Sequence, residues 1–302
     1  MEVLRITPRG YCHGVVDAFR IAKRVRESTG GPVHMLGQLV HNTHATDDLQ
    51  RQGILLVDPP NRLAGLEQIE SGTVIFTAHG VSPQVKRRAE ERGLVAVDAT
   101  CSDVVRTHDL VKELAERGYD VVYVGRKGHP EPEGVMGEAP GRVHLVQDLA
   151  DVEALDLPGE RVAVTCQTTL SVWDTEELIE AVRGRYPAAE VHNEICRATQ
   201  ERQEAAVVAA REVDVVVVVG SPRSSNSCRL VEVVRKLAGK PAYLVDSLDD
   251  IDDRWFAGTR RVGVTSGAST PTHLTRRVVE YLEALDPGSG APEAAEDRGQ
   301  AS

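Results

Sequence analysis

Residues 214–226 read DVVVVVGSPRSSN, a run of valines followed by a glycine and a short polar segment. Continuous β-branched runs of this length are typical of parallel strands that helices cover on both faces. The polar segment then lies at the carboxyl end of its strand, which is where ligands bind in open α/β sheets. This sequence therefore predicts an α/β fold in which a candidate ligand loop follows a buried strand.

Apolar runs alternate with amphipathic segments along the rest of the chain, and such alternation implies helices layered on parallel sheets. The expected strands cover residues 33–36, 73–77, 95–98, 120–124, 161–165, 214–219, 242–245 and 261–265. The expected helices cover residues 15–27, 104–116, 175–185, 203–211, 227–237 and 272–285. The sequence thus predicts an α/β protein built of αβα layers.

Composition limits the classes of function. The 302-residue chain carries a formal net charge of −11, which argues against nucleic acid or an anionic membrane surface as a partner. The chain has neither a recognisable secretory signal nor an apolar run of membrane-spanning length, so we expect a cytoplasmic protein. In that compartment, five cysteines favour metal binding, catalysis or simple burial over disulfide formation.

Three of the five cysteines mark an internal repeat, namely Cys12, Cys101 and Cys196. A first polar loop follows them after 29, 28 and 28 residues, at His41, His129 and Ser224. A second polar loop follows them after 67, 67 and 73 residues, at His79, Thr168 and Ser269. Each cysteine opens an expected helix and each loop follows an apolar strand, so the chain is interpreted as three similar units.

The repeat also predicts how the units are arranged. We expect three αβα domains around a pseudo-threefold axis, formed by residues 1–100, 101–195 and 196–285, with an N-terminal strand packing with the third. Residues 286–302 are rich in Pro, Gly, Ala and Glu and are expected to be a disordered tail. If the domains face one axis, three thiolates and six polar loops converge on a single cavity.

Three thiolates without a fourth form an incomplete metal shell. They could bind zinc together with a histidine, or a [4Fe–4S] cluster with one iron left open. Structural zinc sites usually contain close CxxC pairs, which this sequence lacks, whereas single cysteines far apart suit a cluster held between domains. Cys166 and Cys228 fall outside the repeat and are interpreted as packing residues.

The polar loops offer groups for binding an anion and for proton transfer. Ser224, Ser225 and Asn226 lie where a helix is expected to begin, so they could cap it or, with backbone N–H groups, bind phosphate. The sequence has no GxxxxGK[ST] motif, so a P-loop nucleotide site is not expected. Glu131, shortly after His129, is either a solvated loop residue or, beside a closed cavity, a proton source.

Nine ordered segments resemble the motifs of one known family. They are PRGYCHGVVDA, GQLVHN, FTAHGVSP, VDATCSDVVRTH, GHPEPEGVMG, TCQTTLS, ICRATQERQEA, VGSPRSSNSCRL and VTSGAST. The resemblance runs from about Arg9 to the helix ending near Leu285. Over this length the chain is similar to the LytB family of 4-hydroxy-3-methylbut-2-enyl diphosphate reductases.

The resemblance implies a trefoil of three αβα domains around a central [4Fe–4S] cluster. Its cysteine ligands would be Cys12, Cys101 and Cys196, with the fourth iron left open. Substrate contacts are implied for residues of the polar loops, namely His41, His79, His129, Thr168, Ser224, Ser225, Asn226 and Ser269. Glu131 corresponds to the residue implicated in proton delivery.

The implied reaction is a reductive dehydroxylation, the last step of the methylerythritol phosphate route to isoprenoid precursors. Two electrons and two protons remove the allylic hydroxyl and give isopentenyl and dimethylallyl diphosphates. The open iron would act as a Lewis acid on the substrate oxygen. Because the electrons arrive one at a time, an electron donor of the ferredoxin or flavodoxin type is expected.

The loops expected to bind the diphosphate contain few Lys or Arg, so diphosphate binding is expected to depend on neutral donors, helix N-termini and protonated histidine. Substrate affinity should then weaken as pH rises through the histidine range at about 6.5.

Two rival functions are considered. Quinolinate synthase also has three domains and a three-cysteine cluster, but its carboxylate substrates need no phosphate loops. A non-catalytic iron–sulfur sensor would need no buried proton donor.

Overall fold

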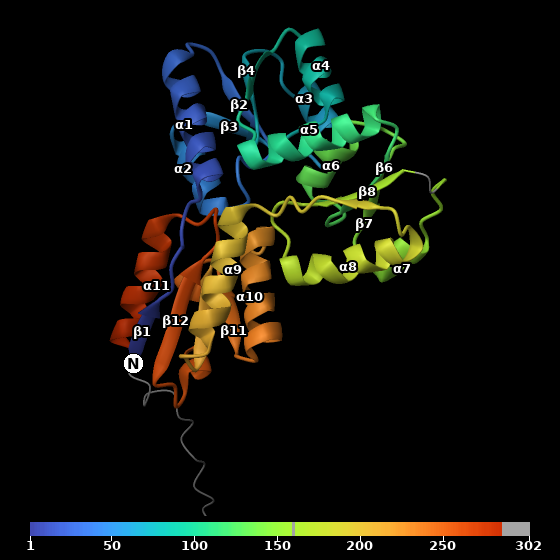
Figure 1. The fold of residues 1–302 in the computed structure, drawn as a ribbon. Helices are drawn as coiled ribbons and strands as arrows, with labels where there is room; N and C mark the ends of the chain where they lie inside the picture. Colours follow the sequence, from blue (N-terminus) through green and yellow to red (C-terminus); the bar gives the residue numbers. More distant parts are fainter. Residues whose placement is uncertain (159–160, 286–302) are drawn as a thin grey trace, which may run out of the picture.

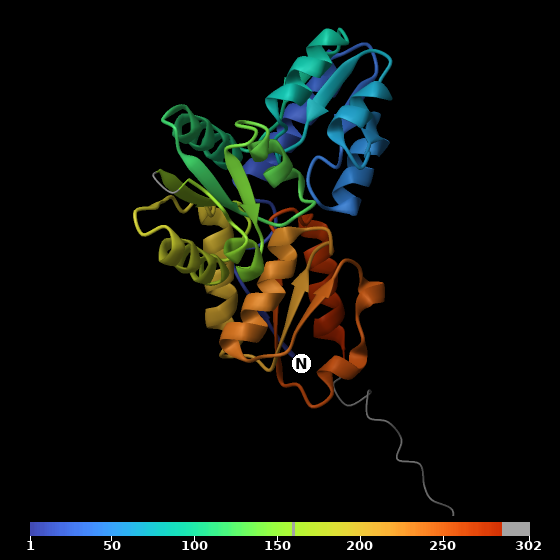
Figure 2. The same ribbon diagram turned by 90° about the vertical axis from the view of Figure 1, so that its right-hand side faces the viewer.

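The computed structural model describes residues 1–158 and 161–285, so the tail expected over residues 286–302 lies outside the described residues. Its strands form three separate parallel sheets of four strands each (Figure 1). In Figure 1 and in the view turned by 90° in Figure 2, consecutive thirds of the chain occupy separate parts of the molecule and meet near its centre. The predicted α/β class, three αβα units around a common centre, is confirmed.

The first sheet has the order β3 (Ile54–Val57), β2 (Val33–Leu36), β4 (Thr73–Phe76) and β5 (Val95–Asp98). Helices α1 (His13–Ser28) and α2 (Thr43–Arg51) pack on one face, and α3 (Arg62–Glu67) and α4 (Pro83–Glu91) pack on the other. Successive side chains of a strand point to opposite faces. Met35 therefore joins the core under α1, and Leu36 joins the core under α3.

The second sheet has the order β7 (Val143–Val146), β6 (Asp120–Val124), β8 (Val162–Cys166) and β9 (Glu190–Val191). Helices α5 (Ser102–Glu116) and α6 (Pro130–Met136) cover one face, and α7 (Leu149–Glu153) and α8 (Val172–Arg185) cover the other. Every residue of β8 is buried, as expected for a strand enclosed between two helical layers.

The third sheet has the order β1 (Glu2–Arg5), β12 (Arg261–Ser266), β10 (Val215–Val219) and β11 (Ala242–Val245). Helices α9 (Arg197–Ala210) and α10 (Ser225–Val233) cover one face and α11 (Thr272–Ala284) covers the other. Helix α10 continues into a π-helical turn, and two 3₁₀ turns follow β11; they span Val234–Ala238, Leu248–Asp250 and Asp253–Phe256. The valine run is the fully buried β10.

Two central strands of each sheet lead into the six polar loops. The carboxyl ends of β2, β6 and β10 precede the first loops, at His41, His129 and Ser224. The carboxyl ends of β4, β8 and β12 precede the second loops, at His79, Thr168 and Ser269. Among the described helices, none combines the length and the apolar character needed to cross a lipid bilayer.

Candidate active site

The three cysteines occupy equivalent positions in the fold. Cys12, Cys101 and Cys196 are the N-cap residues of the long helices α1, α5 and α9. Each cysteine N–H donates to a carbonyl of the second polar loop of a neighbouring unit, at Ala268 (3.2 Å), Ala78 (3.0 Å) and Thr168 (3.0 Å), respectively. These three matching hydrogen bonds close a ring of units, so the thiols face one centre. Helix N-termini at that centre favour an anionic occupant.

All twelve residues expected from the sequence to form the site line a single cavity, which we call the inner cavity. They are Cys12, His41, His79, Cys101, His129, Glu131, Thr168, Cys196, Ser224, Ser225, Asn226 and Ser269. They come from all three sheets and from positions up to 257 residues apart, since the first is residue 12 and the last residue 269. Cys166 and Cys228 do not line this cavity.

The cysteine side chains suit a metal group. Burial raises the pKa of Cys101 to about 12 and the pKa of Cys196 to about 11. The thiols of Cys101 and Cys196 are therefore protonated at neutral pH in the protein alone, and a bound cation would have to displace their protons. Zinc and iron–sulfur clusters both bind through thiolates.

A buried arginine lies beside the thiols. Arg202 of α9 is only 4% exposed, and its Nη2 donates to the carbonyl oxygen of Gly10, two residues before Cys12, at 2.8 Å. Its Nε is buried and has no hydrogen-bond partner among the described residues. A buried cation of this kind usually has an anionic partner. The three thiols and this unpartnered donor together fit a negatively charged thiolate-bound cluster.

Gly14 leaves room for the second of these thiols. A Cβ added at Gly14 would lie 2.3 Å from Cys101 Sγ, closer than two such atoms can approach. Gly14→Ala should therefore displace Cys101 and lower the iron bound per protein, which a colorimetric iron assay would measure. Gly184 is the matched helical control, because a Cβ there meets nothing within 4 Å. Gly184→Ala should keep its iron and gain about 0.4–1 kcal/mol of stability; equal iron in both variants would contradict this account.

Three histidines form a compact group in the inner cavity. The ring centroids of His41 and His79 are 4.1 Å apart, and that of His129 is 4.9 Å and 5.3 Å from them. Burial lowers the pKa of His41 to about 4 and the pKa values of the other two well below the usual range. The rings are therefore neutral at pH 7. Both ring nitrogens of His41 are buried without a partner among the described residues, so they remain available to a ligand.

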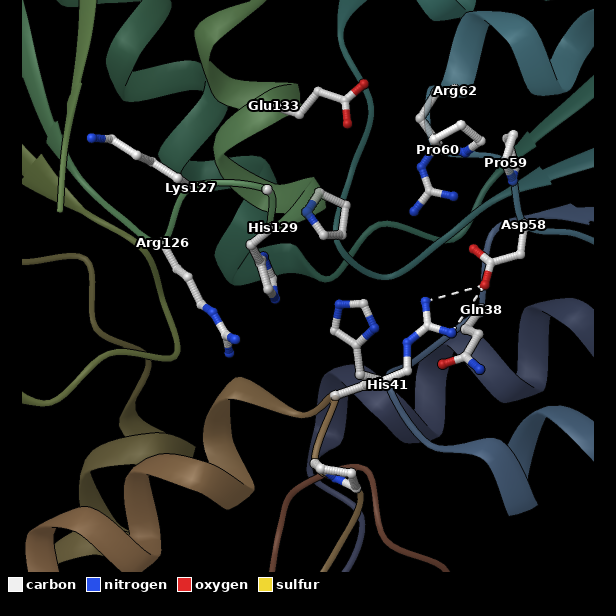
Figure 3. A pocket seen from close by; sticks show the side chains of 14 residues that line it. Gln38, His41, Asp58, Pro59, Pro60, Arg62, Arg126, Lys127, His129 and Glu133 are labelled. Atoms are coloured by element: carbon white, nitrogen blue, oxygen red, sulfur yellow. Dashed lines mark hydrogen bonds and ion pairs between the residues drawn. The ribbon is translucent and has the colours of Figure 1, made fainter.

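Three arginines add positive charge beside the histidine group. Arg62 and Arg126 lie around His41 and His129 (Figure 3), and Arg223 lines the same pocket. All three lower the pKa of His41 in addition to burial. The expectation of few cations considered the diphosphate loops alone, whereas Arg62 and Arg126 come from other segments of the chain. The histidines of the free site have already lost their protons at about pH 6.5, so the expected loss of affinity there stays a prediction that requires proton uptake when the diphosphate binds.

Two groups of side chains could bring three ligand atoms within 4.8 Å of one another, namely His41, His79 and His129, and His13, Cys101 and Asp103. The first group lies beside the three arginines, whose positive charge opposes a bound cation and favours an anion. The second group shares Cys101 with the thiol set, and His13 Nε2 already lies 3.3 Å from Asp103 Oδ2. The thiols at the helix N-termini are the better-formed metal ligands.

Glu131 is held in a closed environment. It is 1% exposed, and its carboxylate accepts hydrogen bonds from Thr168 N (2.7 Å), Thr168 Oγ1 (3.1 Å) and Tyr123 Oη (3.3 Å). Burial raises its pKa to about 7, and these hydrogen bonds oppose the shift. At neutral pH the side chain therefore exists in both protonation states, which suits a residue that delivers a proton.

Burial of Glu131 should cost stability at high pH. The folded pKa of about 7 exceeds the ordinary 4.5, so stability falls as pH rises from about 4.5 to 7. The loss amounts to about 3 kcal/mol at pH 8, since one pKa unit corresponds to about 1.36 kcal/mol. Glu131→Gln, which stays neutral, should melt several degrees higher than the unmodified protein at pH 8 and equally at pH 4.5. Equal melting temperatures across this range would show that the carboxylate carries no desolvation cost.

The hydroxyl and amide groups of the third unit are ordered by one another. Ser224 Oγ caps α10 by accepting from Ser227 N at 3.2 Å, and Ser269 Oγ lies 3.4 Å from it. Asn226 Nδ2 donates to Thr199 Oγ1 at 3.1 Å, and its Oδ1 accepts from Ala268 N at 3.0 Å. Helix capping and phosphate binding, the two roles considered for Ser224, Ser225 and Asn226, are thus compatible, because these residues also line the cavity.

Some residues at the site were not found from the sequence. Thr199 and Arg202 follow Cys196 within the first two turns of the same helix. Arg126 and Arg223 lie inside the polar loops. Their closeness in sequence to predicted site residues could have identified all four. Tyr123 carried none, because a tyrosine in an apolar strand is ordinarily a core residue.

Comparison with known proteins gives one consistent family. A model of the LytB protein family matches residues 3–283. A curated 4-hydroxy-3-methylbut-2-enyl diphosphate reductase from Symbiobacterium thermophilum is 57% identical over 286 residues, covering 94% of this chain and 97% of that protein. A curated reductase of the same description from Anoxybacillus flavithermus is 53% identical over 291 residues, covering 96% and 92%.

Solved structures agree with these relatives. The structure of E-1-hydroxy-2-methyl-but-2-enyl-4-diphosphate reductase from Plasmodium falciparum aligns with a TM-score of 0.89 at 30% identity, over 95% of this chain and 89% of that one. A structure described as (E)-4-hydroxy-3-methyl-but-2-enyl diphosphate reductase, the terminal enzyme of the non-mevalonate pathway, aligns with a TM-score of 0.66 at 31% identity, over 94% and 100%.

Proposed function

The chain belongs to the LytB protein family and is a 4-hydroxy-3-methylbut-2-enyl diphosphate reductase, and from that premise we propose how its residues divide the work. The reaction removes the allylic hydroxyl of the substrate with two electrons and two protons, giving isopentenyl and dimethylallyl diphosphates. It is the terminal step of the non-mevalonate pathway, and the family is an iron–sulfur family.

We propose that Cys12, Cys101 and Cys196 hold a [4Fe–4S] cluster whose fourth iron has no cysteine ligand. The three equivalent N-cap positions, the shared cavity and the unpartnered Nε of Arg202 support this assignment. When bound, such a cluster supplies single electrons and a Lewis-acidic iron. The cysteines are assigned as its ligands because they are the three thiols that line the inner cavity.

We propose that the substrate's diphosphate binds the polar loops of the third unit and the histidine group. Ser224, Ser225, Asn226 and Ser269 offer neutral donors beside the N-terminus of α10, where a helix favours phosphate. The neutral rings of His41, His79 and His129 add N–H donors, and binding of the dianion would raise their lowered pKa values. The diphosphate therefore recruits the protons that the free site lacks.

Glu131 is proposed to deliver the proton that lets the hydroxyl leave as water. Its pKa of about 7 keeps a protonated fraction at neutral pH, and Thr168, which bonds both carboxylate oxygens, orients it. Thr168 Oγ1, which lies 3.1 Å from the Glu131 carboxylate and lines the same cavity, is proposed to contact the substrate's hydroxyl. Burial of the whole group keeps bulk water from the proton donor.

Electrons are proposed to come from a ferredoxin or flavodoxin type of protein in the cytoplasm, since a cluster accepts them singly. We also propose that residues 1–100, 101–195 and 196–285 act as the three domains, with β1 completing the third sheet. Their shared cavity would then tie the chemistry to the relative placement of all three.

The single observation that carries these assignments is the convergence of twelve residues from three units on one cavity. The test is anaerobic turnover of the diphosphate by reconstituted protein with a competent reductant, together with Mössbauer spectra with and without substrate. We expect both product diphosphates and a substrate-dependent change at one iron. Stoichiometric zinc without iron in active protein would overturn the cluster assignment. Absent reduction by a fully loaded protein would favour the sensor alternative, although a sensor gives no reason to bury Glu131.

A further inference from the structure

A second pocket lies directly outside the inner cavity, and we call it the outer pocket. It has a volume of about 400 Å³, and His41 and His129 line both spaces. Figure 3 shows these two rings at the middle of the outer pocket, with charged side chains on either side. The two histidines therefore form a shared wall between the outer pocket and the proposed site of reaction.

Each unit places one arginine in the outer pocket. Arg62 is the first residue of α3, Arg126 follows β6, and Arg223 directly precedes the Ser224 cap of α10. Arg62 is 8% exposed and fixed, because its Nη1 donates to the carbonyl oxygen of Leu36 at 2.6 Å. Arg126 is exposed, and its guanidinium has no ion pair within the described residues. The pocket thus combines a fixed cation, Arg62, with an exposed one, Arg126, that has no ion-pair partner among the described residues.

Acidic residues offset this charge only partly. Asp58 bonds the guanidinium of Arg223 at 3.1 Å, and Glu133 lies on the far side of the pocket near Arg62 (Figure 3). Lys127 also lines the pocket, but its Nζ pairs with Asp151 at 2.6 Å. Three guanidinium groups therefore face two carboxylates in a protein whose net charge is −11. Such a local reversal of sign attracts anions that the rest of the surface repels.

We propose that the outer pocket is an anion-docking subsite that binds the diphosphate group first, before the group moves past the His41 and His129 side chains into the inner cavity. This inference rests on the proposed function, since it assigns the route of the same substrate. Guanidinium groups suit the task because they bind phosphate oxygens in pairs and stay charged at every working pH. The neutral donors of the inner cavity can then determine which diphosphate binds, while the arginines increase the rate at which the diphosphate associates.

Rapid-mixing measurements test the subsite. The anaerobic, oxidised, cluster-loaded enzyme is mixed with 4-hydroxy-3-methylbut-2-enyl diphosphate, and the visible absorption reports binding. We expect Arg126→Gln to lower the association rate constant about tenfold at low ionic strength and to make its salt dependence shallower. The dissociation rate should fall in parallel, because the subsite lies on the path in both directions. Asp58→Asn should have the opposite sign and raise the association rate.

Arg183→Gln is the matched control, since it removes an exposed arginine from α8, which does not line either space. Its association rate should equal that of the unmodified enzyme. An unchanged rate in Arg126→Gln, or the same sign for the Arg126 and Asp58 variants, would overturn the subsite. If the subsite is overturned but the unmodified enzyme still turns over the diphosphate, the proposed function stands. If the unmodified enzyme shows no turnover, the proposed function itself is wrong.

A separate observation concerns Arg202 and the thiols. Besides the bond to Gly10, its Nη1 donates to the carbonyl oxygen of Ala198 at 2.7 Å, so the guanidinium is held between α9 and the loop before Cys12. Arg202 forms no ion pair among the described residues. Negative charge on Cys12 and Cys196, and to a smaller extent on Glu201, would favour the charged form of its guanidinium. We infer that Arg202 is a positioning residue whose charge holds the cluster's reduction potential up.

A redox titration tests this second inference. A buried cation favours the reduced, more negative cluster, so Arg202→Gln should shift the one-electron equilibrium at least tenfold, lowering the midpoint potential by about 59 mV. Arg202→Lys keeps the charge and should stay near the unmodified value. Equal shifts in both variants would mean that shape rather than charge matters and would overturn the inference. If the glutamine variant loses its iron, retention of iron by the lysine variant supports the charge, and loss in both overturns it.

Discussion

Glutamine in place of Glu131 is expected to lower turnover of the diphosphate about 10²–10⁴-fold, the usual contribution of a positioned acid. The amide keeps the shape of the carboxyl group, and its oxygen can still accept from Thr168 N, so the cavity should remain intact. The amide has no acidic proton to give to the leaving hydroxyl. Iron content and substrate binding should therefore be retained while product formation is lost, as measured by steady-state assay and iron analysis.

The pH profile sharpens this prediction. Because burial raises the pKa of Glu131 to about 7, the protonated donor is populated below that pH and lost above it. Turnover of the unmodified enzyme should fall as pH rises through about 7, and the glutamine variant should show a low, flat profile in this range. Glu153→Gln, an exposed change on α7, is the matched control and should leave the profile unaltered. Near-normal turnover by Glu131→Gln would refute the role of proton donor.

Alanine in place of Cys101 is expected to remove most of the bound iron and to lower turnover by more than about 100-fold, since even outer partners of a metal site are worth 10–100-fold. No other thiol can replace it: Cys166 is buried behind the site with its Sγ 3.7 Å from Asn193 Oδ1, and Cys228 lies on α10 away from the inner cavity. Visible absorption of the cluster and iron per protein measure the loss.

Cys228→Ala is the matched control for the cysteine substitution. Cys228 is a partly buried thiol whose Sγ approaches the carbonyl oxygen of Pro222 at 3.3 Å, so its removal changes one thiol without touching the thiol set. Iron content and absorption should match those of the unmodified protein. A full cluster in Cys101→Ala, or an equal loss in Cys228→Ala, would show that the repeat does not identify the ligands.

The sequence was most informative where burial is most complete. The valine run of β10 and the apolar residues of β6 and β8 are enclosed on both faces, so their composition alone predicts parallel strands. The polar loops were predictable for the same reason, because each interrupts an apolar strand abruptly at its carboxyl end. The cysteine spacing also predicted the three-unit organisation, since equal intervals imply equivalent positions in repeated units.

Short elements were less predictable. The helices Arg62–Glu67, Pro130–Met136 and Leu149–Glu153 have five to seven residues, too few for a helical period to appear in the sequence. The strands Ile54–Val57, Val143–Val146 and Glu190–Val191 have at most four residues and were not predicted. Helix α9 begins at Arg197, six residues before its predicted start, because the polar segment after Cys196 continues the same helix.

The electrostatics of the site could not be read from the sequence at all. The pKa values of Glu131 and His41 depend on burial by groups from other units, and the charge of the outer pocket depends on three arginines more than 60 residues apart along the chain. Residue types within one loop do not reveal such proximity. For this reason the sequence did not reveal that the three histidines are neutral in the free site at pH 7.

The pairing of β1 with β12 has a consequence for synthesis of the protein. Leu4 lies opposite Gly263 in this pair, so during synthesis β1 must wait for a partner made 259 residues later. Pairings so distant in sequence form slowly, because a long loop must close first. An ion pair of 2.6 Å joins Arg5, the last residue of β1, to Glu283 in the last turn of α11. A circularly permuted gene that encodes β1 after α11 would make each unit from one continuous segment, and its product should reach the folded state sooner after release.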